Sequence, residues 1–384
     1  MFFDRFREAL SRLPDGLVRT GPPATAEALA SAETALGRPL PAVLRSFLQS
    51  FDGADLFHEA VLIAGVGESA PCALTALNPE PDGPLVFAEV QGGDRFALRA
   101  DGAVLRLRAG DDQNEPERWL AGSDFERWLE ALVAHERLLY GPDGEWAPDA
   151  FEPDGAEILP LVALRQAERA LKLDPGAAEL HHERAVALRR LGRQADSRQA
   201  FARAAALDAE NPWVWFDLGR AALSDGVSGG REALDAFERA ARLEASKKES
   251  KSDKEGQQAA RLWIWAARAA QLLAAPDRLA ACRREALARV PELGAALRRA
   301  RDAAAADDDP DALAAAEALL AALEDPIGPG RMRLAVLSGP AAPPAAAPPP
   351  KRPAAPPKKK AAPPKKKATA RAGARPAPSR RGRR

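Results

Sequence analysis

The sequence predicts an α+β domain at residues 1–145, an all-α repeat domain at residues 155–335 and a disordered tail at residues 340–384. Three observations support this division. In the first part, two helical segments are followed by short apolar runs with the alternating polarity of strands. In the second part, apolar residues recur at helical spacing and the pattern repeats. The third part consists mainly of Pro, Ala and Lys.

Charge is divided unevenly along the chain, although the formal net charge is zero. Residues 340–384 hold 14 Lys and Arg and no Asp or Glu, which leaves 41 basic against 55 acidic side chains in residues 1–339. The sequence therefore predicts an acidic body and a cationic tail.

The N-terminus reads as an amphipathic helix. Apolar side chains at Phe2, Phe6 and Leu10 share one face, and the charges between them exclude a signal sequence or a membrane span. Such a helix could lie on a membrane surface, but packing against the following domain is the expected arrangement.

The sequence of the last third of the first domain predicts a hairpin followed by a closing helix. Asp101 and Gly102 stand between two segments of alternating polarity, which is typical of a hairpin with a tight primed turn. Ser123 and Glu126 have the spacing of a capping box before a run of helical periodicity. A half-covered antiparallel sheet with flanking helices is the expected architecture.

Two stretches of this domain resemble the SUKH superfamily, which includes the fungal cell-wall assembly regulators. They are ALASAETALGRPLPAVLRSFLQSFDGADLF and FAEVQGGDRFALRADGAVLRLRAGDDQ, the second followed by SDFERWL, and the resemblance covers residues 20–135. The resemblance implies protein binding without catalysis. Many bacterial members act as immunity proteins that neutralise toxins, and fungal members act as signalling hubs.

Within this resemblance, Gly93 and Asp94 fall at the family's Gly-Asp and Trp128 near its last aromatic. We expect Gly93 to supply a bulge or turn, Asp94 to cap backbone amides and Trp128 to be in the core. A protein-binding role for Asp94 is the alternative.

The second domain repeats with a period of 36 residues. The corresponding residues are Phe201 and Phe237, Ala204 and Ala240, and Leu207 and Leu243. This pattern resembles the tetratricopeptide repeat, whose period is 34, with two residues added in a turn around Gly229 and Gly230. The resemblance implies stacked antiparallel helix pairs with a groove that binds a peptide or extended protein segment.

Several large side chains occupy or neighbour first-helix positions of the repeats. His181, Trp215 and Trp263 are our candidate protein-binding residues there, and Trp265 lies beside them. The alternative is that they pack between repeats, because aromatic side chains stabilise cores as well as interfaces.

The ends of the repeats are less regular. GEWAPDAFEPDG is too rich in Pro and Gly for a helix, and SKKESKSDKEGQQ is expected to be an extended loop or a frayed helix end. A final helix pair is expected to cap the stack, with Asp309 as an N-cap and Pro310 in the first helical position.

The tail is similar to those of linker-histone-like bacterial proteins, and its PPKKK blocks would neutralise phosphates without sequence choice. The candidate polyanion-binding residues are Lys358, Lys359, Lys360, Lys365, Lys366, Lys367, Arg380 and Arg381. The alternative is that the tail contacts the acidic body of its own chain.

No motif in the sequence indicates catalysis, a metal or a cofactor. The four histidines lack ligand spacing, and the paired acids Asp111 and Asp112 are typical of loops. Cys72 and Cys282 are the only cysteines, so no disulfide framework is expected and a reducing, cytoplasmic location fits.

We therefore expect a non-enzymatic adaptor or scaffold that holds proteins on both folded domains. The alternatives are an immunity protein, whose toxin would bind the first domain, and a nucleic-acid-associated protein that acts through its tail.

Overall fold

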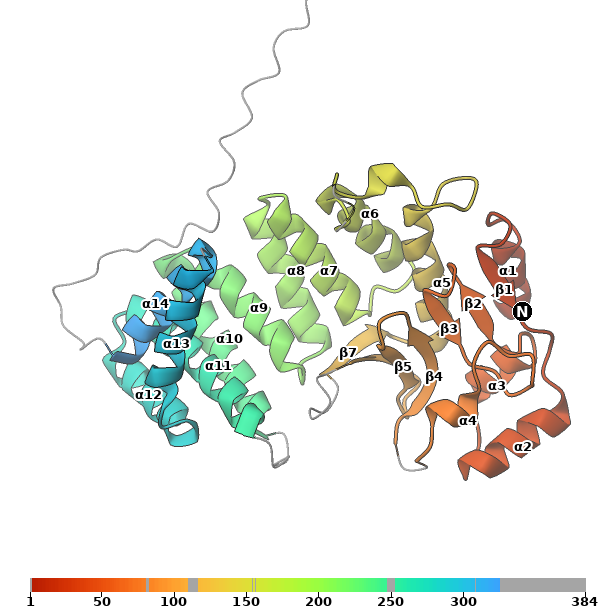
Figure 1. Ribbon diagram of the computed structural model, residues 1–384, viewed down its shortest axis with the longest axis horizontal. Helices are drawn as coiled ribbons and strands as arrows, with labels where there is room; N and C mark the ends of the chain where they lie inside the picture. Colours follow the sequence, from red (N-terminus) through yellow and green to blue (C-terminus); the bar gives the residue numbers. More distant parts are fainter. Residues whose placement is uncertain are drawn as a thin grey trace, which may run out of the picture. The chain divides into compact units, whose positions relative to one another are not determined.

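In the part of the chain that the structure describes, seven strands form one antiparallel sheet in which each strand pairs with the next along the chain (Figure 1). The strands are β1 (Val18–Thr20), β2 (Ala54–Leu56), β3 (Val61–Ile63), β4 (Leu85–Val90), β5 (Arg95–Leu98), β6 (Val104–Arg108) and β7 (Glu117–Gly122). The structure, a computed structural model, describes residues 2–80, 83–109, 117–153, 155, 157–246, 253–307 and 309–324. Asp111, Asp112 and the whole predicted tail lie outside these residues.

Five helices accompany the sheet, and an aromatic cluster joins helices to strands. The helices are α1 (Phe2–Leu10), α2 (Ala26–Leu36), α3 (Ala42–Leu48), α4 (Leu74–Leu77) and α5 (Phe125–Glu136). The ring of Phe125 lies 5.5 Å from that of Phe47 in α3 and 5.1 Å from that of Phe87 in β4, measured between centroids. Trp128 is buried in the same core, as predicted. The apolar face of α1 packs there too, which confirms the expected packing of the N-terminal helix.

The predicted hairpin is present, but its turn is of a different type. Leu98 pairs with Val104, and Gly102 alone among the connecting residues has a positive φ, of 89°. The amide of Gly102 donates to the carbonyl of Arg99. Both primed two-residue turns need a positive φ at the first central residue, here Asp101, and Asp101 has none, so the prediction of a primed turn was wrong. The chain makes a longer turn in which glycine supplies the left-handed residue.

The predicted capping box before α5 was also wrong. The carboxylate of Asp124 accepts the amide of Arg127 at 2.8 Å and caps the helix, while the hydroxyl of Ser123 has no hydrogen-bond partner among the described residues. Asp is as good an N-cap as Ser, and both precede the apolar run, so spacing alone did not identify the capping residue.

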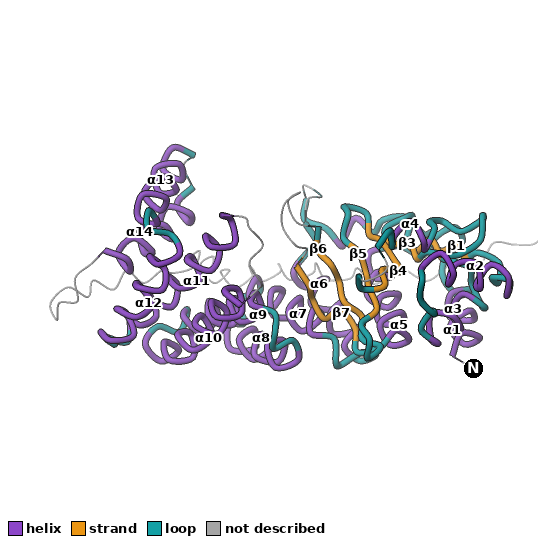
Figure 2. Tube along the Cα trace, turned by 90° about the horizontal axis from the view of Figure 1, so that it is seen from below, coloured by secondary structure: helices purple, strands orange, loops and turns teal. Residues whose placement is uncertain are grey.

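Helices dominate the rest of the described chain, which also has two short 3-10 turns, η1 (Arg137–Leu139) and η2 (Pro148–Ala150), and isolated β-bridges such as that of Tyr140 with Trp146. The helices are α6 (Pro160–Leu171), α7 (Ala178–Arg190), α8 (Gln194–Leu207), α9 (Pro212–Leu223), α10 (Val227–Ser246), α11 (Asp253–Leu272), α12 (Pro276–Arg289), α13 (Leu293–Ala306) and α14 (Pro310–Glu324). Consecutive helices from α6 to α12 lie side by side, whereas α13 packs on α14 and α14 packs on α11 (Figures 1 and 2). None of the described helices combines the length and apolar character needed to cross a bilayer.

The sequence repeat corresponds to the second helices of two successive pairs. Phe201 of α8 and Phe237 of α10 are both fully buried, as are Ala204 and Ala240 one turn later. Asp309 caps α14 by accepting the amide of Ala312 at 3.0 Å, which confirms that predicted cap. Residues from Asp253 onward, predicted as loop or frayed helix, belong to α11, and 247–252 lie outside the described residues.

Gly229 and Gly230 do not form the predicted turn, because α10 already begins at Val227. A Cβ on Gly229 would lie only 1.9 Å from the carbonyl oxygen of Ala222 in α9, and one on Gly230 would lie 2.9 Å from a methyl carbon of Leu273. These glycines therefore allow α10 to approach its neighbours closely.

Helix α5 connects the two kinds of architecture. It closes the α+β part and also packs against α6, so that α6 has a helical partner although GEWAPDAFEPDG forms no α-helix. The side-chain amide of Gln166 in α6, buried at 1% exposure, donates to the carbonyl of His135 at 3.2 Å. The helical stack therefore begins on a helix of the α+β part.

Replacing Gly229 with Ala tests the close approach of α9 and α10. We expect destabilisation of about 2–3 kcal/mol, because overpacking against backbone outweighs the gain of about 1 kcal/mol in helix propensity. The free energy of unfolding is measured in urea. Gly294→Ala is the matched control, because the nearest atom to its Cβ is a flexible carboxylate oxygen of Glu324. Equal effects at both positions would contradict the packing role.

Candidate functional site

The four predicted protein-binding residues do not form one site. Asp94 follows the turn between β4 and β5, and His181, Trp215 and Trp263 lie on α7, α9 and α11. Asp94 belongs to a polar junction between the sheet and α7. Trp263 belongs to a separate pocket lined by α10, α11 and α12.

Asp94 holds an arginine in place. Its carboxylate accepts the Nε–H of Arg106 at 2.8 Å and the amide of Ala109 at 2.9 Å, so that it caps a backbone amide as expected. Gly93 before it has φ of 95°, which confirms that glycine supplies the turn conformation here.

The junction centres on the carboxylate of Glu179 in α7, which is 4% exposed. Arg106 and Arg108 of β6 each place a guanidinium nitrogen 3.2 Å from the same oxygen of Glu179, Oε1. Burial and the nearby carboxylate of Glu183 raise the pKa of Glu179, against the opposite effect of the two guanidinium groups. Because a buried carboxylate is costly without such partners, this contact holds α7 against the sheet.

A second ion pair lies between α5 and α7. His135 donates through Nε2 to a carboxylate oxygen of Glu183 at 3.1 Å and through Nδ1 to one of Glu136 at 2.9 Å. Burial lowers the pKa of His135, but these two carboxylates more than offset it and raise the pKa to about 10. His135 is therefore an imidazolium at neutral pH.

Backbone groups around β7 are bonded by side chains from the helical part. The amide of Leu120 donates to Asp208 at 3.1 Å, and the carbonyl of Arg118 accepts from Asn211 at 3.0 Å. The amide of Ser123, just after the strand, donates to Asp174 at 2.7 Å. This edge of the sheet is therefore covered within the chain.

Two of the predicted residues make local hydrogen bonds. The Nε2 of His181 lies 3.1 Å from the carbonyl oxygen of Pro175, and burial lowers the pKa of this histidine. The indole N–H of Trp215 donates to the carbonyl of Ala209 at 3.0 Å, and its ring packs against two apolar clusters.

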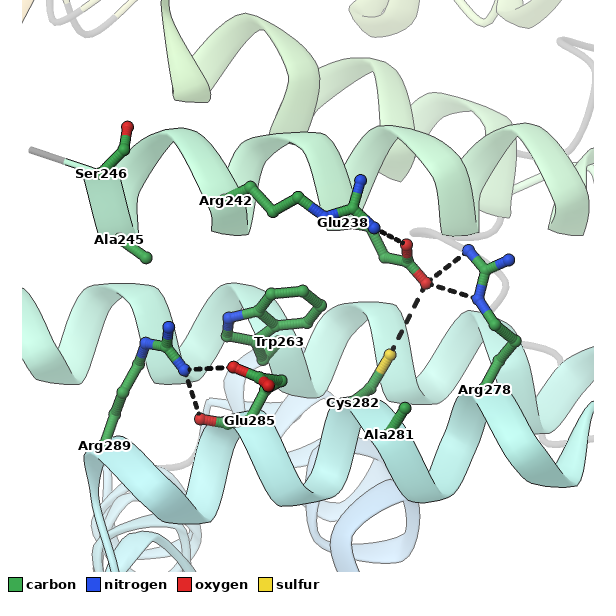
Figure 3. A pocket seen from close by; sticks show the side chains of 10 residues that line it. All are labelled: Glu238, Arg242, Ala245, Ser246, Trp263, Arg278, Ala281, Cys282, Glu285 and Arg289. Carbon is green, nitrogen blue, oxygen red and sulfur yellow. Dashed lines mark hydrogen bonds and ion pairs between the residues drawn. The ribbon is translucent and has the colours of Figure 1, made fainter.

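Trp263 lines a pocket of about 580 Å³ between α10, α11 and α12 (Figure 3). The lining residues are Glu238, Arg242, Ala245, Ser246, Trp263, Arg278, Ala281, Cys282, Glu285 and Arg289. Nine of the ten come from α10 and α12, which are second helices of successive pairs. The pocket is therefore not lined mainly by the first-helix positions from which the groove was predicted.

The carboxylate of Glu238 is the most buried charge in this pocket. It accepts from Arg278 at 2.5 and 2.8 Å and from Arg242 at 2.5 Å. Burial and the charge of Glu238 raise the pKa of the Cys282 thiol to about 12, so Cys282 is neutral at pH 7. Glu285 and Arg289 form a separate pair, with 2.8 Å between their nearest oxygen and nitrogen.

The sequence did not single out the charged residues of the pocket. Glu238 and Arg242, like Glu285 and Arg289, are spaced four residues apart, which usually indicates a solvent-exposed helix face. Only the packing of α12 against α11 brings the two pairs around Trp263. Among the described residues, no group of three or more His, Cys, Asp or Glu is placed to hold a metal ion.

Comparisons with known proteins agree with the predicted resemblance. The model of the SMI1 / KNR4 family (SUKH-1) matches residues 23–131, which confirms the SUKH resemblance of the first part. A comparison with curated protein sequences gives no match.

Several solved structures match the later part of the chain. A MamA structure has 20% sequence identity to this chain and a TM-score of 0.29. The match covers 35% of this chain and 66% of the MamA chain, so this chain spans just under two thirds of that structure's length. YrrB, described as a TPR protein with an unusual peptide-binding site, has 15% identity and a TM-score of 0.29, covering 43% of this chain and 78% of its own.

Glu179→Gln tests the junction. We expect the free energy of unfolding to fall by about 3 kcal/mol, the lower end for breaking a buried ion pair, because both arginines retain some solvent contact. Urea denaturation measures the change. Glu168→Gln is the control, because its 3.6 Å pair with Arg184 is exposed and should contribute about 0.5 kcal/mol or less. A loss below about 1 kcal/mol for Glu179→Gln would show that the junction does not depend on this carboxylate.

His135 should make stability depend on pH. Its pKa is raised from 6.5 to about 10 in the fold, so its contribution is complete below pH 6.5 and is lost as pH rises towards 10. We expect the stability difference between the native chain and His135→Gln to be largest near pH 6 and to shrink by at most about 1.4 kcal/mol per pH unit above that. A difference that is constant across this range would contradict the ion pair with Glu183.

Proposed function

We propose that this chain is a non-enzymatic adaptor or scaffold that binds proteins on an α+β domain and a helical stack held as one rigid unit. The observation that carries the proposal is the junction, in which Arg106 and Arg108 enclose the buried carboxylate of Glu179. Because β6, β7 and α5 are all fixed to the helices, surfaces on the two parts keep a constant spacing. A constant spacing suits a protein that holds two partners, or two parts of one partner.

The titratable groups support a binding rather than a catalytic role. Burial raises the pKa of Cys72 to about 11 and that of Cys282 to about 12, so neither is a ready nucleophile. His135 has a pKa of about 10 and is paired on both nitrogens, which does not suit a general base near neutral pH. Two neutral thiols in separate parts of the fold also fit the proposed cytoplasmic location.

The match of residues 23–131 to the SUKH-1 model favours a narrower version, in which the α+β domain neutralises a toxin. In that version the toxin is the protein partner, and a toxin gene would lie beside the gene for this chain.

The composition of residues 340–384 favours a second function. Its 14 basic residues and absence of acidic ones would bind nucleic acid by counterion release, with strong salt dependence and no sequence preference.

Affinity capture from the native cell extract tests the scaffold. We expect the full chain and a version ending at Gly339, both treated with nuclease, to recover the same defined protein. Recovery is measured by mass spectrometry against a capture with the Glu179→Gln variant, which should recover less because the two parts lose their fixed spacing.

One result of the same experiment would contradict the scaffold proposal. If the shortened version recovers nothing and nuclease removes what the full chain captures, the tail's polyanion binding is the main activity and the scaffold proposal is wrong.

A further inference from the structure

Most hydrogen-bond acceptors of the pocket on α10, α11 and α12 already have partners. Both oxygens of Glu238 are bonded to guanidinium groups, and Glu285 accepts from Arg289 (Figure 3). The hydroxyl of Ser246 donates to the carbonyl of Leu243 within its own helix. A ligand that brings further hydrogen-bond donors would therefore find few acceptors.

The same pocket retains donors. The indole nitrogen of Trp263, a residue that is 7% exposed, is buried and has no hydrogen-bond partner among the residues that the structure describes. Figure 3 shows this nitrogen on the side of the pocket where Arg289 lies. Among the described residues, Arg289 donates only through one terminal nitrogen and Arg242 only through one, so each guanidinium keeps N–H groups for a ligand. A buried N–H without a partner is unfavourable, and a ligand oxygen would relieve this cost.

The charges around the pocket set the charge of its ligand. Arg242, Arg278 and Arg289 contribute three positive charges, and Glu238 and Glu285 contribute two negative ones. Asp235, outside the lining, also pairs with Arg278 at 3.6 Å, so the charges of this cluster balance. A single carboxylate adds only one negative charge, whereas a phosphate would bring up to two beside three carboxylates.

We propose that this pocket binds the carboxylate of an acidic side chain in an extended segment of a partner protein. The carboxylate oxygens accept from Arg289 and from the indole N–H of Trp263, and Arg242 lies at the exposed edge for a neighbouring acidic residue. The volume of about 580 Å³ falls in the range of ligand pockets. This inference rests on the proposed protein-binding function and adds a second binding surface, on the second helices of the stack.

Titration of a labelled peptide into the full chain tests this site. The probe is fluorescein-labelled Gly-Glu-Glu-Glu-Gly with a blocked carboxyl terminus, followed by fluorescence polarisation at low salt. The same peptide with Gln in place of Glu is the neutral control, and peptides with phosphoserine in place of Glu distinguish phosphate from carboxylate. We expect saturable binding of the Glu peptide that exceeds binding of both others.

Two variants locate the binding. Arg289→Gln removes the positive charge, and Trp263→Phe removes the indole N–H. Both variants keep most of the side-chain volume. Each should weaken binding of the Glu peptide, by roughly tenfold or more for Arg289→Gln because a charge-assisted hydrogen bond is lost. Arg301→Gln is the matched control, since it removes one exposed positive charge on α13, outside the pocket. Circular dichroism confirms that all variants are folded.

Three outcomes would overturn the assignment: equal binding of the Gln peptide, preferred binding of the phosphoserine peptide, or equal loss in Arg301→Gln and Arg289→Gln. None of them would refute the scaffold proposal, because affinity capture with the Arg289→Gln chain reports on the remaining surfaces. The scaffold proposal itself would be refuted if the native chain captured no defined protein.

Discussion

The arrangement of this protein depends on a carboxylate buried between two arginines. Glu179 belongs to the first turn of α7, and Arg106 and Arg108 reach it from alternate positions of β6. A carboxylate at 4% exposure is stable only with such partners, so the sheet and the helices must meet with little freedom of position. Asp94 adds to this constraint because it holds the Nε–H of Arg106 while another nitrogen of that guanidinium contacts Glu179. The residue suggested by the SUKH resemblance thus acts inside the chain.

Much of the fold could be predicted from the sequence, because local patterns report local structure. The burial of Phe201 and Phe237, the cap at Asp309 and the hairpin between β5 and β6 all depend on residues close in sequence. The errors have the same origin. Asp101-Gly102 fits more than one turn, and Gly229 meets Ala222 through packing of two helices, which spacing alone does not show.

The candidate sites were harder to predict because they depend on contacts between distant segments. Arg106 and Arg108 alternate with Leu105 and Leu107, a pattern that is typical of a strand with one face towards water or a partner. That face meets the chain's own helix instead. Trp263 was identified as a large first-helix aromatic, but nothing in the sequence shows that α12 would place arginines around it. Charged pairs four residues apart look alike whether they line a pocket or an exposed face.

The central claim is that the α+β part and the helical stack fold as one unit. Differential scanning calorimetry of the full chain tests it most directly. The account predicts one cooperative transition, with equal calorimetric and van't Hoff enthalpies, because the buried junction couples the two parts. Two separate transitions in the native chain would contradict it, since they would show that the sheet and the helices unfold independently.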